Sequence, residues 1–177
     1  MKKALLRVSA FMFVCSMAFP ALAADRATAK IINTAGQEIG EALLTEGPNG
    51  VLIYVSAKNL QPGPKAIHIH SVGTCEDPGQ GFVASKGHVN PASKQHGLMN
   101  ADGPDSGDLP NLFVHSDGTV EVEMFSPFAS LNSAAGRTML LDEDGSALVI
   151  HEKRDDHMTQ PIGGAGARIA CGLISAN

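Results

Sequence analysis

Two histidines one residue apart, in the run Ile67-His68-Ile69-His70, are the sharpest chemical signal in the chain. Residues at positions i and i+2 of a β-strand share a face and lie roughly 7 Å apart. If this run is a strand, both imidazoles point one way and both isoleucines point into the core. A metal ion bridges such a pair easily, although the pair alone is weak evidence for one.

Further histidines and two carboxylates strengthen the case for a metal site. The chain contains seven histidines: His68, His70, His88, His96, His115, His151 and His157. His88 and His96 are followed by Asp105 and Asp108, and His151 ends an apolar run. Imidazoles and carboxylates together suit a divalent first-row metal. Imidazole suits both copper and zinc, so residue type alone leaves the metal open.

Short β-strands are the elements that would position these side chains. We expect strands at residues 27–33, 38–45, 51–57, 65–71, 111–115, 119–125, 138–141, 147–152 and 168–174. Turn signals such as Asp117-Gly118 separate them, and helical periodicity is scarce. Many short strands without intervening helices predict a β-sandwich or a small barrel. We expect His115, beside that turn, and His157, in a polar stretch, to be surface residues.

Residues 72–110 do not fit a plain sandwich, because they have little strand pattern and many Gly, Pro, Asn and Asp residues. A loop of this length in a compact domain is usually functional or disordered. This one contains Cys75, His88, His96, Asp105 and Asp108. A disulfide and a metal ion would order it, so we expect a functional loop.

The first 23 residues are typical of a secretory signal peptide. A basic start is followed by an apolar run and by the small-x-small site Ala21-Leu22-Ala23, with cleavage expected after Ala23. A transmembrane anchor is the alternative, but the run is shorter than the roughly 18 residues that such an anchor needs, and it contains Pro20. After cleavage we expect an exported protein without a membrane segment, formed by residues 24–177, which suffice for one domain.

Charge and cysteine content narrow the function classes. The whole chain has a net charge of −5. Three of its thirteen basic residues and none of its eighteen acidic residues lie in residues 1–23, so the mature chain carries −8. This argues against a nucleic-acid partner, because a basic footprint is missing. Two cysteines remain, Cys75 and Cys171, and in an exported protein an even pair predicts a disulfide. Two buried free thiols are the alternative.

Six short motifs together resemble the Cu/Zn superoxide dismutase family of the bacterial periplasm. They are HIHSVGTC (68–75), GHVNP (87–91), KQHG (94–97), GDLPN (107–111), VIHEKRDD (149–156) and GGAGARIACG (163–172). Their order and spacing are highly specific, and they cover nearly the whole mature chain. The resemblance implies an all-β fold, an eight-stranded Greek-key β-barrel or sandwich with a long metal-binding loop. It leaves a homodimer open.

The resemblance also implies two adjoining metal sites. Copper would be bound by His68, His70, His88 and His151, and His88 would bridge copper to zinc. Arg168 would guide the anionic substrate beside the copper, and Cys75 and Cys171 would tie the long loop to the last strand. Asp155 would join a copper histidine to a zinc histidine, which makes physical sense because a carboxylate fixes the tautomer and orientation of ligating imidazoles.

The zinc ligands implied are His88, His96, Asp105 and Asp108, and Asp105 departs from the family pattern. Relatives carry a histidine at its position, three residues before the aspartate of the GDLP motif. Zinc accepts carboxylate oxygens, so two histidines and two aspartates are chemically possible. We expect zinc to bind, but more weakly than with a third histidine. The alternative is an empty second site with Asp105 as a turn residue.

The reaction implied by the resemblance is the conversion of superoxide to oxygen and hydrogen peroxide. Copper would be alternately reduced and oxidised, zinc would be its structural neighbour, and His88 would be a candidate proton donor. A mature chain at −8 repels superoxide overall, so attraction must be local, at the metals and Arg168. The rival hypothesis is a non-enzymatic copper-binding module on the same fold, which would need the four copper histidines but not Arg168.

Overall fold

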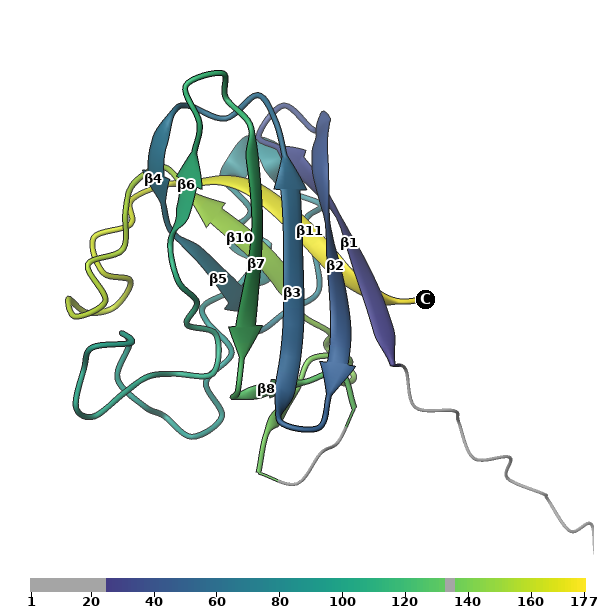
Figure 1. The fold of residues 1–177 in the computed structure, drawn as a ribbon, viewed down its shortest axis with the longest axis vertical. Coiled ribbons are helices and arrows are strands. Elements are labelled where there is room, and N and C mark those ends of the chain that lie inside the picture. Colours follow the sequence, from purple (N-terminus) through teal and green to yellow (C-terminus); the bar gives the residue numbers. More distant parts are fainter. Residues whose placement is uncertain (1–24, 133–135) are drawn as a thin grey trace, which may run out of the picture.

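The computed structural model describes residues 25–132 and 136–177. The expected signal peptide, residues 1–23, lies outside them. Most of the molecule is a curled seven-stranded sheet in the order β5-β10-β11-β1-β2-β3-β7, with antiparallel neighbours throughout (Figure 1). Its strands are β1 (Arg26–Asn33), β2 (Glu38–Gly47), β3 (Gly50–Ala57), β5 (Ile67–His70), β7 (Val120–Ser126), β10 (Ala147–His151) and β11 (Arg168–Ala176).

Two short strands close this sheet into a barrel. β4 (Gly63–Lys65) precedes β5 with only Ala66 between them, and it pairs with β6 (Leu112–Val114). β6 turns back into β7, where the His115 backbone N–H donates to the Thr119 carbonyl at 2.8 Å. With β4 and β5 counted as one strand, the ring has eight strands. Because β3 lies beside β7 and β5 beside β10, the connections are of the Greek-key type. The predicted fold is confirmed.

Buried and exposed side chains alternate along the strands, and the buried ones fill the interior of the barrel. On β2, Ala42 and Leu44 are buried, while Leu43 between them and Thr45 after them are exposed. This period of two is what a strand with one wet face requires. By contrast, all five residues of β10 are buried. One face of β10 belongs to the main core, and its Ala147 and Val149 pack against Phe82 of the long loop in a second, smaller cluster.

The long loop therefore covers the outer face of β5, β10 and β11. It contains two single-turn 3₁₀ helices, η1 (Pro78–Gln80) and η2 (Val83–Ser85). The disulfide Cys75–Cys171 anchors it to β11, which confirms the predicted bond. Among the described residues, none of the helices has the length and hydropathy of a membrane span.

The expected strands are all present, with three differences. The expected strand 65–71 is interrupted at Ala66, whose N–H and carbonyl bond to Lys153 and His151 instead of to β6. The expected strand 138–141 is only a two-residue strand, β9 (Thr138–Met139), which pairs in parallel with β8 (Ala129–Ser130). β8 was not predicted, because two residues carry no periodicity.

Candidate metal centre

Three histidines share the outer face of β5 and β10. In the antiparallel register, Val149 lies opposite His68 and Ala147 lies opposite His70. Directly opposed residues point to the same face, so both histidines stand on the side of β10 that Phe82 covers. His151 follows on that face two residues after Val149. Ile67 and Ile69 point into the main core, as the alternating run predicts.

His88 of the long loop completes a four-histidine cluster. A short antiparallel bridge between His70 and His88 brings the loop to β5. The ring centroid of His88 lies 4.1 Å from that of His68 and 5.4 Å from that of His70. His151 lies 5.0 Å and 6.0 Å from the same two rings. The name four-histidine cluster is used below for His68, His70, His88 and His151.

Each ring of this cluster has one buried nitrogen without a hydrogen-bond partner. These atoms are His68 Nδ1, His70 Nε2, His88 Nε2 and His151 Nε2. The other ring nitrogen of each strand histidine is engaged. His68 Nε2 contacts Asp155 Oδ2 at 2.8 Å. His70 Nδ1 contacts the Lys86 carbonyl at 2.8 Å, and His151 Nδ1 contacts the Gly166 carbonyl at 3.0 Å. All three partners are acceptors, so the proton lies on the contacted nitrogen and the free nitrogen carries a lone pair. Buried lone pairs of this kind are what a metal ion would satisfy.

Burial also keeps these three rings unprotonated. Loss of hydration lowers the pKa of His68 from 6.5 to about 3, with the Asp155 hydrogen bond acting in the opposite direction. Burial likewise lowers the pKa of His70 to about 2 and that of His151 to about 4. Neutral imidazole is the form that binds a metal ion, so the cluster is ready to coordinate one at neutral pH.

A second set of ligand atoms adjoins the first through His88. Ligand atoms of His88, His96, Asp105 and Asp108 all lie within 4.8 Å of one another. His88 Nδ1 is 2.9 Å from Asp105 Oδ2 and 3.5 Å from Asp108 Oδ1, and His96 Nδ1 is 2.6 Å from Asp108 Oδ1. The name mixed cluster is used below for these four residues. His88 alone belongs to both clusters, with Nε2 in one and Nδ1 in the other.

Each carboxylate of the mixed cluster has one oxygen held by the backbone and one pointing inward. Asp105 Oδ1 accepts the Gly107 N–H at 2.9 Å. Asp108 Oδ2 accepts the N–H groups of Gly97 at 2.7 Å and of Asp105 at 3.0 Å. The inward atoms His96 Nδ1 and Asp108 Oδ1 lie 2.6 Å apart, although they do not meet as a hydrogen bond of ordinary geometry. A proton or a metal cation between them would satisfy both atoms. The shorter arm of Asp105 reaches the cluster.

The mixed cluster has the opposite electrostatics to the four-histidine cluster. For His96, burial opposes protonation, but hydrogen bonds to Asp108 and Asp155 outweigh it and raise the pKa to about 10. The pKa of His88 is also raised, since its contacts with Asp105 and Asp108 outweigh burial. The same contacts hold the pKa of Asp108 well below its ordinary value, against the effect of burial. Without a metal, these groups pair with one another.

Asp155 links the two clusters. Its Oδ2 contacts His68 Nε2 at 2.8 Å and its Oδ1 contacts His96 Nε2 at 3.1 Å. Hydrogen bonds from both imidazoles hold its pKa far below the ordinary value despite burial. One carboxylate thus sets the proton position of a ring in each cluster. Asp155 lies where the sequence motif places it, buried beneath the site.

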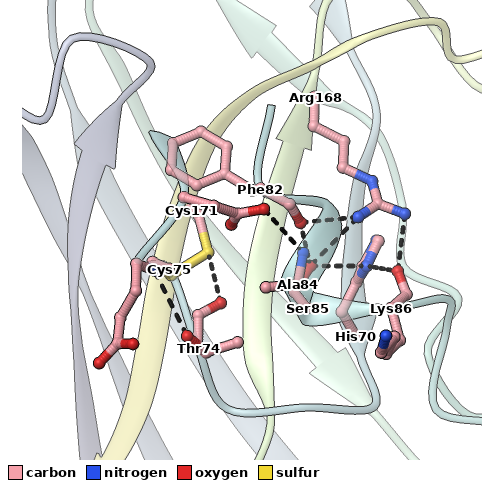
Figure 2. The surroundings of a disulfide bond; sticks show 11 residues. His70, Thr74, Cys75, Phe82, Ala84, Ser85, Lys86, Arg168 and Cys171 are labelled. Atoms are coloured by element: carbon pink, nitrogen blue, oxygen red, sulfur yellow. Dashed lines mark hydrogen bonds between the residues drawn. A yellow bond between two sulfur atoms is a disulfide. The ribbon is translucent and has the colours of Figure 1, made fainter. Parts of the chain in front are cut away.

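Arg168 is held by the long loop beside His70 (Figure 2). Its guanidinium donates to the Phe82 carbonyl at 2.7 Å and to the Lys86 carbonyl at 2.6 Å. The Lys86 carbonyl also accepts the ring N–H of His70, so one backbone oxygen joins the arginine to a histidine of the cluster. Partial burial lowers the pKa of Arg168, but a guanidinium stays charged at any physiological pH.

One expectation about the histidines is wrong. His157 is not a surface residue: its side chain is 15% exposed, and its ring contacts Asp155 and Asn111. His115 is exposed, as expected. Asn111 was not singled out, although it sits in the GDLPN motif. The carbonyls of Lys86 and Gly166 could not have been found by residue type, because every residue has a backbone carbonyl.

Comparison with known proteins agrees with this geometry. Residues 38–174 match the family model described as copper/zinc superoxide dismutase (SODC). A superoxide dismutase [Cu-Zn] of Caulobacter vibrioides is 49% identical over 149 residues, which cover 84% of each chain.

Two solved structures are also similar. The crystal structure of a SOD-like protein from Bacillus subtilis is 41% identical, with a TM-score of 0.77, over 82% of this chain and 95% of that one. The Cu/Zn superoxide dismutase from Brucella abortus is 28% identical, with a TM-score of 0.68, over 85% and 99%. The match of the family model over most of the chain, together with these relatives, shows that this protein belongs to the Cu/Zn superoxide dismutase family.

Proposed function

We propose that this protein is a superoxide dismutase that binds copper at the four-histidine cluster and zinc at the mixed cluster. The observation that carries the proposal is the set of four buried imidazole nitrogens without partners, on rings whose other nitrogens are already engaged. Four imidazole nitrogens suit copper, and two imidazoles with two carboxylates suit zinc. The family match supports both metals.

Bound copper supplies a one-electron couple, which takes an electron from one superoxide and gives one to a second. The residues supply the rest. Arg168 presents a fixed positive charge with fork-like donors, which attract and orient a small anion. Its anchoring by two carbonyls keeps that charge beside His70. His88 is the candidate proton donor, because its Nε2 can hold a proton while Nδ1 stays in the mixed cluster.

We also infer that the protein is exported to the periplasm after cleavage at Ala23. The basic start, the apolar run and the small-x-small site support this inference. The disulfide between Cys75 and Cys171 supports it independently, because disulfides persist in oxidising compartments. Mass spectrometry of protein purified from the periplasmic fraction would test it. A mature chain beginning at Ala24 is expected, and an intact N-terminus would contradict the inference.

Superoxide decay followed by stopped flow, on protein loaded with copper and zinc, tests the function. We expect catalysis that depends on copper and survives in a His115→Ala control, which removes an exposed histidine away from the site. Copper bound at one ion per chain without catalysis would support the rival, a copper-binding module. Failure to bind copper at all would overturn both hypotheses.

A further inference from the structure

His157 occupies a position that neither metal cluster explains. It lies two residues after Asp155 and adopts a positive φ of 61°, which is uncommon for any residue other than glycine. Its backbone N–H donates to Asp155 Oδ1 at 2.6 Å. Its carbonyl accepts the Met99 N–H at 3.2 Å, in the segment that follows His96. A side chain at Gly97 would overlap this carbonyl, so the glycine permits the close approach.

The ring of His157 has a defined hydrogen-bonding pattern. Asn111 Oδ1 accepts the Asp155 backbone N–H at 2.8 Å, which fixes the orientation of the Asn111 amide. Asn111 Nδ2 therefore faces the Asp155 carbonyl at 2.9 Å and His157 Nε2 at 3.0 Å. An amide NH₂ only donates, so Nε2 must accept and the ring proton must lie on Nδ1. That nitrogen lies 3.5 Å from Asp155 Oδ2, a contact too long or too poorly aligned to be a hydrogen bond, and it has no hydrogen-bond partner.

We propose that His157 is a positioning residue for the two-metal centre, which acts on both oxygens of the Asp155 carboxylate, through a backbone hydrogen bond to one and an electrostatic contact of its ring N–H with the other. Its backbone N–H holds Oδ1, which also contacts His96, and its Nδ1–H faces Oδ2, which also contacts His68. Rotation of the carboxylate would break the backbone hydrogen bond to Oδ1 and move Oδ2 away from the ring N–H. Its fixed orientation in turn fixes the ring protons of His68 and His96.

The proposal rests on the ligand sets under the proposed function, since it needs His96 to be a zinc ligand. Groups that orient metal-bound imidazoles typically contribute about 10- to 100-fold to metal affinity. His157 does not contact these imidazoles itself but acts on them through the Asp155 carboxylate. We therefore expect the lower end of that range for His157, about 10-fold.

Three variants separate positioning from packing. His157→Phe keeps an aromatic ring but removes both nitrogens. His157→Gln restores the pattern, because its amide oxygen can accept from Asn111 and its NH₂ can donate to Asp155. His115→Phe is the matched control at an exposed histidine. None of the three introduces glycine, so neither variant at position 157 gains the freedom that glycine has at a positive φ.

The first measurement is zinc affinity by competition with a chelator, together with the melting temperature of each metal-free variant. We expect about 10-fold weaker zinc binding in His157→Phe, recovery in His157→Gln and no change in His115→Phe. A role in packing alone would lower the melting temperature of both variants at position 157 without this difference in affinity. Equal zinc affinity in His157→Phe and the unaltered protein would overturn the proposal.

The second measurement needs no metal and no variant. Nitrogen-15 NMR of the metal-free protein reports which nitrogen of His157 carries the proton. The proposal requires a protonated Nδ1 and an accepting Nε2, and a proton on Nε2 alone would contradict it. If the unaltered protein bound no zinc, the zinc assignment of the proposed function would fall, while this spectrum would still decide the contact between His157 and Asp155.

Discussion

The four-histidine cluster and the mixed cluster share His88 but are built in different ways. The first takes three of its four rings from β5 and β10, and their free nitrogens have no partners. The second lies entirely in the long loop, and its imidazoles and carboxylates contact one another at 2.6–3.5 Å. The pKa values of the strand histidines are lowered, whereas those of His88 and His96 are raised.

Because of this difference in contacts and pKa values, we expect the two clusters to bind a metal ion in different ways. The three strand histidines of the four-histidine cluster are preorganised and kept neutral, so among these four rings only His88 favours a proton that a metal would displace. In the mixed cluster the carboxylates favour the protonated form of both imidazoles, so a metal must compete with protons there. We therefore expect zinc binding to release more protons than copper binding.

The largest effect is expected from removing a strand histidine. His151→Ala, or equally His68→Ala, should abolish dismutation and weaken copper binding by at least about 100-fold, because a ligand should matter more than the groups that orient it. The barrel should persist, since neither ring packs in the main core. Copper titration and superoxide decay would check this. Full activity in either purified variant would contradict the assignment of copper to the four-histidine cluster.

Arg168→Ala should slow superoxide decay by about 10-fold, because local electrostatic steering accounts for at least that much in charged clefts. The rate should also depend less on salt, since an attractive charge is lost. Copper content should not change, because Arg168 reaches His70 through intermediate groups, the Lys86 carbonyl and the Ser85 hydroxyl. An unchanged rate together with an unchanged salt slope would refute a guiding role.

A smaller effect is expected at the mixed cluster. Asp105→Asn keeps the shape of the side chain but removes its charge, and we expect zinc to bind about 10-fold more weakly, with copper unaffected. Asp102→Asn, an exposed aspartate of the same loop, is the control. Zinc affinity that is equal in the two variants would make Asp105 a turn residue. The expectation that Asp105→His tightens zinc binding stays a prediction for the same titration.

A separate effect concerns the pH dependence of the metal-free protein. His68, His70 and His151 have folded-state pKa values of about 3, 2 and 4, below the ordinary 6.5. Below pH 6.5 the unfolded chain binds more protons, so the free energy of unfolding should fall with falling pH towards 4. His96, with a pKa of about 10, stabilises the fold below 6.5 and loses this effect as the pH rises through 10. Urea unfolding across pH checks this; greater stability on acidification would contradict it.

Much of the fold and the site could be predicted because the signals are local. Alternation around His68 and His70 predicts both the strand and the shared face. Turn residues predict most strand ends. The presence of two cysteines in the mature chain predicts the bond between Cys75 and Cys171. These features depend on neighbours in sequence or on counting, so no knowledge of tertiary packing was needed.

The rest depends on contacts between distant segments. A polar stretch predicts exposure for His157, but a positive φ and the approach of Gly97 turn its ring towards Asp155. The reach of Asp105 depends on the Gly107 N–H, which holds its other oxygen. The Lys86 carbonyl, which joins Arg168 to His70, has no signature in residue type. Such backbone partners emerge only from the folded loop.

Anomalous X-ray diffraction at the copper and zinc edges, on crystals of protein loaded with both metals, tests the division between the two clusters most directly. The account predicts a copper peak among His68, His70, His88 and His151. It predicts a separate zinc peak among His88, His96, Asp105 and Asp108. A copper peak outside the four histidines, or no zinc within the mixed cluster, would contradict it.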